Sequence, residues 1–160
     1  MQDFLVNFGN WLQNTAVGLW VSGTVWGYPY VQLTHFFGLS LWVGTIVIVD
    51  LRLLGLVGGR QTASQLAEQL APLKWAGLGI AATGGLLLFS GLAETYVQNP
   101  AFLTKLPLLL LGIAYHVVIQ RKMPQWGESM GTPPLAKVAG FTELLLWIGV
   151  IFAATEIPSY

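Results

Sequence analysis

LTHFFGLSLWVGTIVIVDLRLLGL, residues 33–56, decides the fold, because this stretch is long and apolar enough to cross a lipid bilayer. It also contains three residues that hydrocarbon disfavours: His35 near its start, and Asp50 and Arg52 near its end. Ionisable side chains within a membrane span are functional candidates by default. The function of this chain therefore depends on what these three side chains contact.

The composition is that of a membrane protein. Of the 160 residues, 54% are hydrophobic and 9% are charged, whereas about 25% are charged in ordinary soluble domains. Seven basic and seven acidic residues cancel, which leaves no basic surface for nucleic acid, and we expect no such partner. The chain has no cysteine, which excludes disulfides, thiolate catalysis and cysteine-ligated clusters.

Three further apolar segments resemble the first in length. Together the four predicted spans cover residues 31–56, 73–97, 101–120 and 135–154. A short amphipathic helix is expected at residues 64–71, with Pro72 in the first turn of the second span, and residues 121–134 are expected to form a loop. The fold class predicted is all-α, an integral membrane four-helix bundle.

The N-terminal segment is predicted to lie in the membrane interface. Within residues 3–21 apolar side chains follow helical spacing, with asparagines on the opposite face. Because this helix is too polar to span, we expect it to lie along the headgroups, followed by an aromatic Gly-Pro break. The chain then divides into residues 1–28, an interfacial anchor, and residues 29–160, the four-span domain.

The distribution of lysine and arginine predicts the orientation. The first and third connections are flanked by six basic residues: Arg52, Arg60, Lys74, Arg121, Lys122 and Lys137. Only Lys105 lies on the other side. The positive-inside rule then places both termini outside a bacterial inner membrane. The expected partners are the lipid bilayer and either further copies of the chain or other membrane subunits.

Glycine is frequent in the predicted spans. The second span contains five, Gly77, Gly79, Gly84, Gly85 and Gly91. Small residues allow helix backbones to approach closely in a membrane. We therefore expect the second span to be central to the bundle.

The intramembrane polar residues fall at two depths when helical rise is converted to distance. The outer level contains His35, Glu94, Tyr96 and Lys105, with Tyr30 above them. The inner level contains Asp50, Arg52, His116 and Glu143. Glu143 needs a partner, and His116 or Arg52 is the nearest in depth. Arg52 is expected to reach the headgroups, and Asp50 to pair across the bundle or with the first connection.

The two histidines, His35 and His116, are the candidate cofactor-binding residues. His35 lies about 22 Å above Asp50, and the two histidines differ in depth by about 13 Å or more. One chain therefore cannot place both imidazoles on one haem. A second ligand for His35 would come from another protomer or a partner, and Gly38 is expected to leave room for a flat ring.

The motifs resemble an uncharacterised bacterial family of small four-helix membrane proteins. The likeness covers roughly residues 26–154 and rests on His-x-x-Gly and Asp-Leu-Arg-Leu-Leu-Gly in the first span, Thr-Gly-x-x-x-Leu-Phe in the second, and Phe-x-x-Lys at the entry to the third. It implies that His35, Asp50, Arg52, Phe102 and Lys105 are family positions. A weaker likeness, in THFFGLSLWVG and KLPLLLLG, is to the membrane domains of copper-resistance permeases.

Three functions are open at this point. The leading hypothesis is a non-catalytic or redox-accessory subunit that binds haem b through His35. The second is a small permease or metal-handling protein with a polar path past Asp50, His116 and Glu143. The third is a structural subunit of a larger complex. No hydrolase, phosphate-loop or zinc-protease motif is present, and each polar level has only one histidine, so the sequence indicates neither an enzyme nor a defined metal site.

Overall fold

The computed structural model describes residues 2–57, 61–126 and 133–157, and this part of the chain is almost entirely α-helical. The helices are α1 (Gln2–Gln13), α2 (Ala16–Gly23), α3 (Gly27–Leu54), α4 (Ala63–Gly91), α5 (Ala93–Gln98), α6 (Pro100–Trp126) and α7 (Pro134–Thr155). By length and hydropathy, α3, α4, α6 and α7 can each cross a membrane. The prediction of an all-α bundle with four spans is confirmed.

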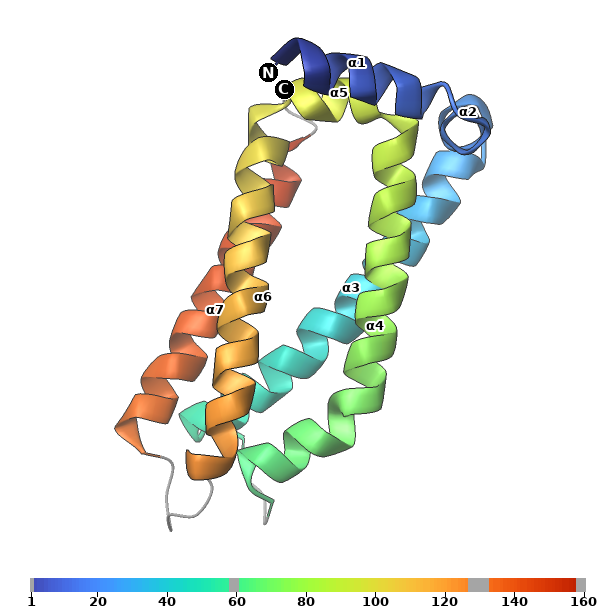
Figure 1. Cartoon of the computed structure of the whole chain (residues 1–160). Helices are drawn as coiled ribbons and strands as arrows, with labels where there is room; N and C mark the ends of the chain where they lie inside the picture. The colour runs from blue at the N-terminus through green and yellow to red at the C-terminus, as the bar shows by residue number, and fades with distance from the viewer. Residues whose placement is uncertain (1, 58–60, 127–132, 158–160) are drawn as a thin grey trace.

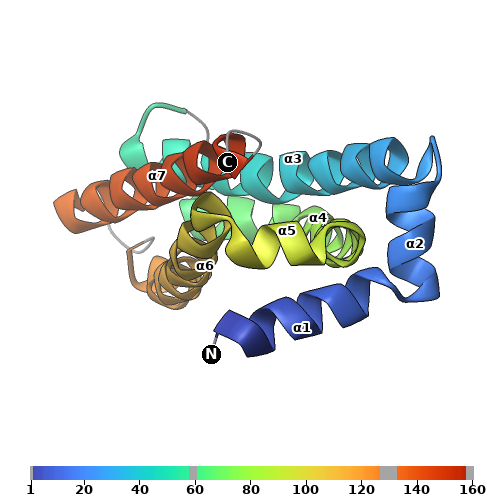
Figure 2. The same ribbon diagram turned by 90° about the horizontal axis from the view of Figure 1, so that it is seen from above.

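The long helices form two hairpins, α3–α4 and α6–α7 (Figure 1). Both chain termini lie at one end of the bundle together with α1, α2 and α5, and we call this the terminal end. The opposite end, where α3 is connected to α4 and α6 to α7, is the loop end. Seen from above, α1 and α5 lie across the ends of the spans, and α2 joins α1 to α3 (Figure 2).

The N-terminal segment is two helices, not the single helix predicted over residues 3–21. The chain breaks after α1 because Thr15 caps α2: the Gly18 N–H donates to the Thr15 side-chain oxygen over 3.2 Å. Phe4 and Trp11 of α1 are 71% and 64% exposed. Exposed aromatic rings on a helix lying across the bundle suit the headgroup level, and the interfacial placement stays a prediction.

The boundaries of α3 and α4 differ from those predicted. Helix α3 begins at Gly27 and takes Pro29 into its first turn. Helix α4 is one helix of 29 residues, so residues 64–71 do not form a separate helix and Pro72 lies inside α4. It begins at Thr62, whose capping box with Gln65 satisfies the first turn. The predicted second span is also too long, because α4 ends at Gly91 and α5 follows.

The third span is longer than predicted. Helix α6 continues to Trp126, so residues 121–126 are helical and not part of the loop. Asn99 caps its start, since the Phe102 N–H donates to the Asn99 Oδ1 over 3.0 Å. The Asn99 amide also donates to the Ile157 carbonyl over 2.7 Å, which ties the C-terminal segment to the terminal end.

The α3–α4 hairpin is held by glycines with a close backbone approach. A Cβ at Gly38 would overlap the backbone nitrogen of Ala81, and one at Gly77 would lie 2.6 Å from the backbone nitrogen of Trp42. Gly84 packs in the same way on His35. A Cβ at Gly79 would meet nothing within 4 Å. Only some of the glycines of α4 therefore serve helix packing.

The outward faces of the bundle are apolar. Leu86, Leu110 and Ile148, from α4, α6 and α7, are 70%, 68% and 61% exposed. A water-soluble monomer rarely exposes so many large apolar side chains together. These faces suit contact with lipid.

Candidate functional site

Each of the four spanning helices contributes one buried ionisable residue to a single site. Asp50 comes from α3, Lys74 from α4, His116 from α6 and Glu143 from α7, and their exposed fractions are 1%, 4%, 5% and 0%. We call these four residues the polar cluster. Residues of these types are almost never fully buried unless they are paired, so the contacts among them define the chemistry of the site.

His116 is the centre of the polar cluster. Its Nδ1 lies 2.6 Å from Glu143 Oε1, and its Nε2 lies 3.2 Å from Lys74 Nζ. An ammonium group can only donate. With Lys74 charged, Nε2 therefore accepts, and the Nδ1–H donates to the Glu143 carboxylate. The three side chains form a continuous hydrogen-bonded chain from α4 through α6 to α7.

Asp50 closes the cluster from α3. Its carboxyl group lies within hydrogen-bonding reach of the Glu143 carboxyl group. Among the residues that the structure describes, Asp50 Oδ2 and Glu143 Oε2 are both buried with no hydrogen-bond partner. Two neighbouring carboxyl groups in a buried site disfavour double ionisation, and a proton shared between them relieves it. The geometry therefore suits a cluster that carries one proton on its acidic pair.

Tryptophan rings surround the polar cluster on the side toward the terminal end. The ring of Trp42 lies edge-on to His116 at a centroid distance of 5.4 Å and to Trp147 at 6.1 Å. The Trp147 indole N–H also donates to Glu143 Oε1 over 3.5 Å. Lys74 Nζ lies 5.2 Å from the centre of the Trp75 ring, a cation–π distance. The rings of Trp42 and Trp147, both 2% exposed, cover the polar cluster on this side.

The structure decides between the partners expected for Glu143 and Asp50, and it adds a residue that was not expected in the site. Glu143 is bonded to His116, one of the two partners, His116 and Arg52, that its depth allowed. Asp50 pairs across the bundle, one of the two outcomes expected for it. Lys74, assigned by the sequence to the flank of a connection, is instead buried against His116.

Arg52 is the arginine of the first connection whose contacts the structure describes. Arg52 Nε donates to the Gln61 carbonyl over 3.0 Å, so this side chain binds the connection between α3 and α4 and does not only reach toward headgroups. Arg60 lies outside the described residues.

The outer polar level does not assemble as expected. His35 bonds through Nδ1 to the Ala81 carbonyl over 2.7 Å, and neither Glu94 nor a tyrosine is its partner. Glu94 lies on α5 with its backbone N–H donating to the Gln13 side chain over 3.2 Å. Lys105 is close enough to influence His35 electrostatically. The space at Gly38 is filled by the backbone of α4, so the expectation that it leaves room for a flat ring is wrong.

A stack of aromatic rings joins α4, α5 and α6 at the terminal end. Tyr96 and Phe102 stack with ring centres 5.1 Å apart, and Phe89 and Phe102 at 5.5 Å. The Tyr96 hydroxyl lies 3.4 Å from that of Tyr28. Burial, and then the hydrogen bond with Tyr28, raise the pKa of Tyr96, so this phenol stays neutral and structural at physiological pH.

The two histidines differ in what they offer a cofactor. Both ring nitrogens of His116 are engaged within the polar cluster. In His35 the Nδ1–H must donate, because a carbonyl only accepts, and this leaves Nε2 with a lone pair and with no hydrogen bond to the part of the chain that the structure describes. Within that same part, no three histidine, aspartate or glutamate side chains are placed to hold a metal ion.

Comparison with known proteins gives one match. A model of the family DUF6644, described as a family of unknown function, matches residues 8–158. No curated protein and no solved structure matches the chain. The match covers α2 to α7 completely and all residues of the polar cluster. The chain therefore belongs to the DUF6644 family.

Proposed function

We propose that this protein is a small multi-pass permease that takes up and releases protons at the polar cluster. The observation that carries the proposal is a charge count. Two carboxyl groups, Asp50 and Glu143, share the site with one lysine and a neutral histidine tautomer. With both acids ionised, the buried cluster would carry an uncompensated negative charge, which hydrocarbon disfavours strongly. One additional proton balances it.

The hydrogen-bonded chain also supports proton movement. In the chain from Lys74 through His116 to Glu143, a proton can shift from the ammonium to Nε2 while another shifts from Nδ1 to the carboxylate. Histidine suits this role because its two nitrogens exchange donor and acceptor functions near neutral pH. From the likeness to copper-resistance permeases we keep the transport function and propose no metal substrate. The site has one histidine, and the described residues contain no group of three side chains placed to hold a metal ion.

We further propose a bacterial inner membrane with both termini outside. The described basic residues near the loop end are Arg52, Arg121, Lys122 and Lys137, whereas Lys105 lies toward the terminal end. Removing the buried Lys74 from the count leaves this asymmetry intact. Four spans also bring the two termini to one side of a membrane, in agreement with their common end in Figure 1.

The proposal is tested by proton flux into vesicles that contain the purified protein. We expect an imposed potential to drive flux in the native protein, and Asp50→Asn or Glu143→Gln to reduce it to the level of empty vesicles. Either change leaves one acid to balance Lys74, so no extra proton is needed. The infrared carbonyl band of a buried protonated acid should disappear in both variants.

The matched control is Glu68→Gln, which removes an exposed acid from the same helix as Lys74 and should change neither reading. Flux equal to that of empty vesicles in the native protein, or unchanged in Asp50→Asn, would contradict the proposal. The polar cluster would then hold the bundle together, as in a structural subunit.

One observation favours a second function, a redox-accessory subunit that binds haem b through His35. Histidines that ligate metals usually donate their second ring N–H to a carbonyl or carboxylate, which fixes the tautomer. His35 has this arrangement with the Ala81 carbonyl at 2.7 Å. His116 offers no free nitrogen, so the second axial ligand would come from a second protomer or a partner subunit.

The haem proposal has its own measurement. A pyridine haemochrome assay on protein isolated from its native membrane, with partners retained, should detect haem b in the native chain and lose it in His35→Ala. Thr34→Val, a change at the neighbouring exposed position, should keep it. Absence of haem from the native preparation would end the redox hypothesis without affecting the proton flux experiment.

A further inference from the structure

The polar cluster lies between two apolar layers on every spanning helix. One layer, which we call the loop-side layer, consists of the buried residues Val49, Leu53, Ile119, Met123, Ala136 and Ala139. The other, the terminal-side layer, consists of the buried residues Trp42, Ile46, Trp147 and Val150. Along α7 Glu143 falls between Ala139 and Trp147, and along α3 Asp50 falls between Ile46 and Leu53. Along α6 His116 falls between Ile119 and the partly buried Ile113, which packs against the terminal-side layer.

Helix α4 repeats the pattern with partly buried residues. Ala63, Leu66, Ala67 and Leu70 pack against the loop-side layer, and Leu78 packs against the terminal-side layer. Lys74 lies between Leu70 and Leu78 in the chain. All four helices therefore present the same order of apolar, ionisable and apolar side chains along the bundle axis.

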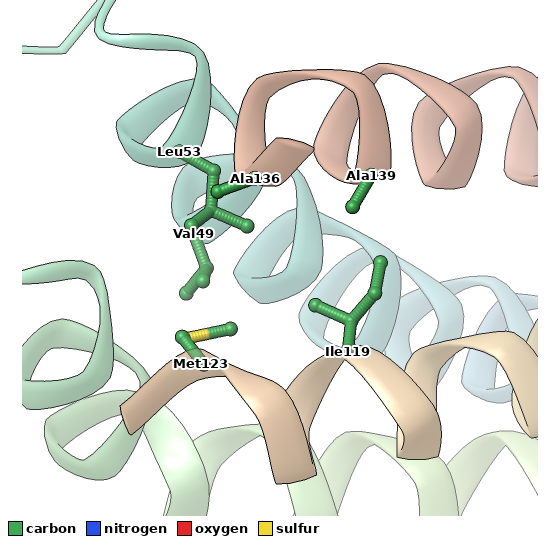
Figure 3. Close-up of a cluster of buried hydrophobic side chains, with 6 residues drawn as sticks. All are labelled: Val49, Leu53, Ile119, Met123, Ala136 and Ala139. Atoms are coloured by element: carbon green, nitrogen blue, oxygen red, sulfur yellow. The ribbon is translucent and has the colours of Figure 1, made fainter. Parts of the chain in front are cut away.

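The loop-side layer closes the polar cluster toward the loop end. Figure 3 shows Met123 of α6 pointing toward Val49 of α3, and Ile119 of α6 pointing toward Ala139 of α7, with Leu53 and Ala136 close together above Val49. Leu53, Ile119 and Met123 are 1%, 2% and 3% exposed. The contacts run between the two hairpins, so this layer opens only if the hairpins separate at the loop end.

The terminal-side layer closes the cluster toward the other end and touches it directly. Trp42 contacts His116 and Trp147 contacts Glu143, while the two indole rings pack edge to face. This layer also runs between the hairpins, since Trp42 belongs to α3 and Trp147 to α7. Beyond it, α4 and α6 diverge toward the terminal end (Figure 1).

We propose that the two apolar layers are alternating gates and that the structure is the occluded state of the proton site. This inference rests on the proposed function, because it describes how the same polar cluster would exchange its proton with one side at a time. The buried side chains of the two layers are apolar apart from the indole N–H groups of Trp42 and Trp147. The hydroxyl groups beside the layers, on Thr45 and Tyr115, each donate to a backbone carbonyl, over 2.8 Å and 3.5 Å. A proton bound at Asp50 and Glu143 therefore leaves only when one layer separates and water enters.

The hairpins supply the moving parts. Backbone contacts at Gly38, Gly77 and Gly84 join α3 and α4 into one unit. The link from Lys74 to His116 and the link from Asp50 to Glu143 both cross between the hairpins. The cluster thus forms the pivot between a layer that separates on one side and a layer that stays packed on the other.

The gates are tested with one cysteine, introduced as Gly112→Cys into this cysteine-free chain. Gly112 lies one helical turn from His116, and a Cβ there would meet only the Trp147 ring, at an ordinary 3.8 Å. We expect almost no reaction with a membrane-impermeant thiol reagent from either side. Trp42→Ala should make labelling at least about tenfold faster from the terminal side and leave labelling from the loop side unchanged. The double variant Ile119→Ala with Met123→Ala should make labelling faster by the same factor from the loop side alone.

The control is Leu110→Ala, an exposed side chain on the same helix, which should leave labelling unchanged. Where Trp42→Ala does not fold, Ile46→Ala opens the same layer more gently. Labelling from the same side whichever layer is truncated, or no gain from either truncation in folded protein, overturns the gates. Thiol labelling does not depend on proton flux, so the two experiments can fail separately. Proton flux that is unchanged in Asp50→Asn would contradict the proton function. Labelling that does not depend on which layer is truncated would contradict the gates.

Discussion

His116→Ala should lower the free energy of unfolding by about 3–5 kcal/mol, the range found when one partner of a buried ion pair is removed. The substitution leaves Glu143 and Lys74 without their shared partner in a site that is almost completely buried. Unfolding of the purified protein in mixed micelles measures the change.

A double-mutant cycle separates the pair from simple loss of packing. In a Glu143→Gln background, His116→Ala should be less destabilising, because no buried charge is left behind. Val118→Ala, a lipid-facing change on the same helix, serves as the control. Additive losses in the cycle would show that His116 and Glu143 do not stabilise each other.

Gly38→Ala should destabilise the α3–α4 hairpin by about 1–3 kcal/mol or more, the usual effect of overpacking. The added methyl group would overlap the Ala81 backbone nitrogen and lie 2.9 Å from both Ala81 Cα and the Gly77 carbonyl oxygen. Backbone atoms cannot turn aside as a flexible side chain does, so the two helices must separate. The same unfolding measurement in micelles reports the loss.

Gly44→Ala is the matched control for Gly38→Ala. It lies on the same helix, and a Cβ there meets nothing within 4 Å. It should be neutral or stabilising by about 0.5–1 kcal/mol, the helix preference of alanine over glycine. Equal effects at Gly38 and Gly44 would mean that close backbone approach does not hold this hairpin.

The four long apolar helices could be predicted because they depend on local sequence. The thickness of a bilayer sets the length of a spanning apolar segment, and four such segments are visible in the hydropathy along the sequence. The partner of Glu143 could be narrowed to His116 or Arg52, because a fixed rise per residue converts sequence position into depth, and the structure selects His116.

Lys74 shows where the sequence argument failed. A lysine close to a predicted connection is expected at its flank when Pro72 marks the first turn of a span. In the structure α4 begins about three turns earlier, and Lys74 is buried inside the bundle. The capping box formed by Thr62 and Gln65 was a readable signal for this earlier start.

The partner of His35 could not be read from side-chain types at all. The acceptor is a backbone carbonyl, that of Ala81, which becomes reachable because Gly84 and Gly85 place no side chain against the imidazole. Depth arithmetic compares only polar side chains, and it places His35 at the level of Glu94, Tyr96 and Lys105 without naming a backbone acceptor. A backbone partner depends on how closely two helices pack, which is a tertiary property.

The oblique course of α3 links the bundle to the thickness of its membrane. At 1.5 Å per residue the 28 residues of α3 extend about 42 Å, whereas the hydrocarbon core of a bilayer is about 30 Å thick. Tilting accommodates such a mismatch, and Figure 1 shows α3 running obliquely behind α4. A thicker bilayer favours a smaller tilt, and α3 carries Trp42 of one apolar layer and Leu53 of the other. Lipid chain length is therefore a mechanical variable that acts on both layers through a single helix.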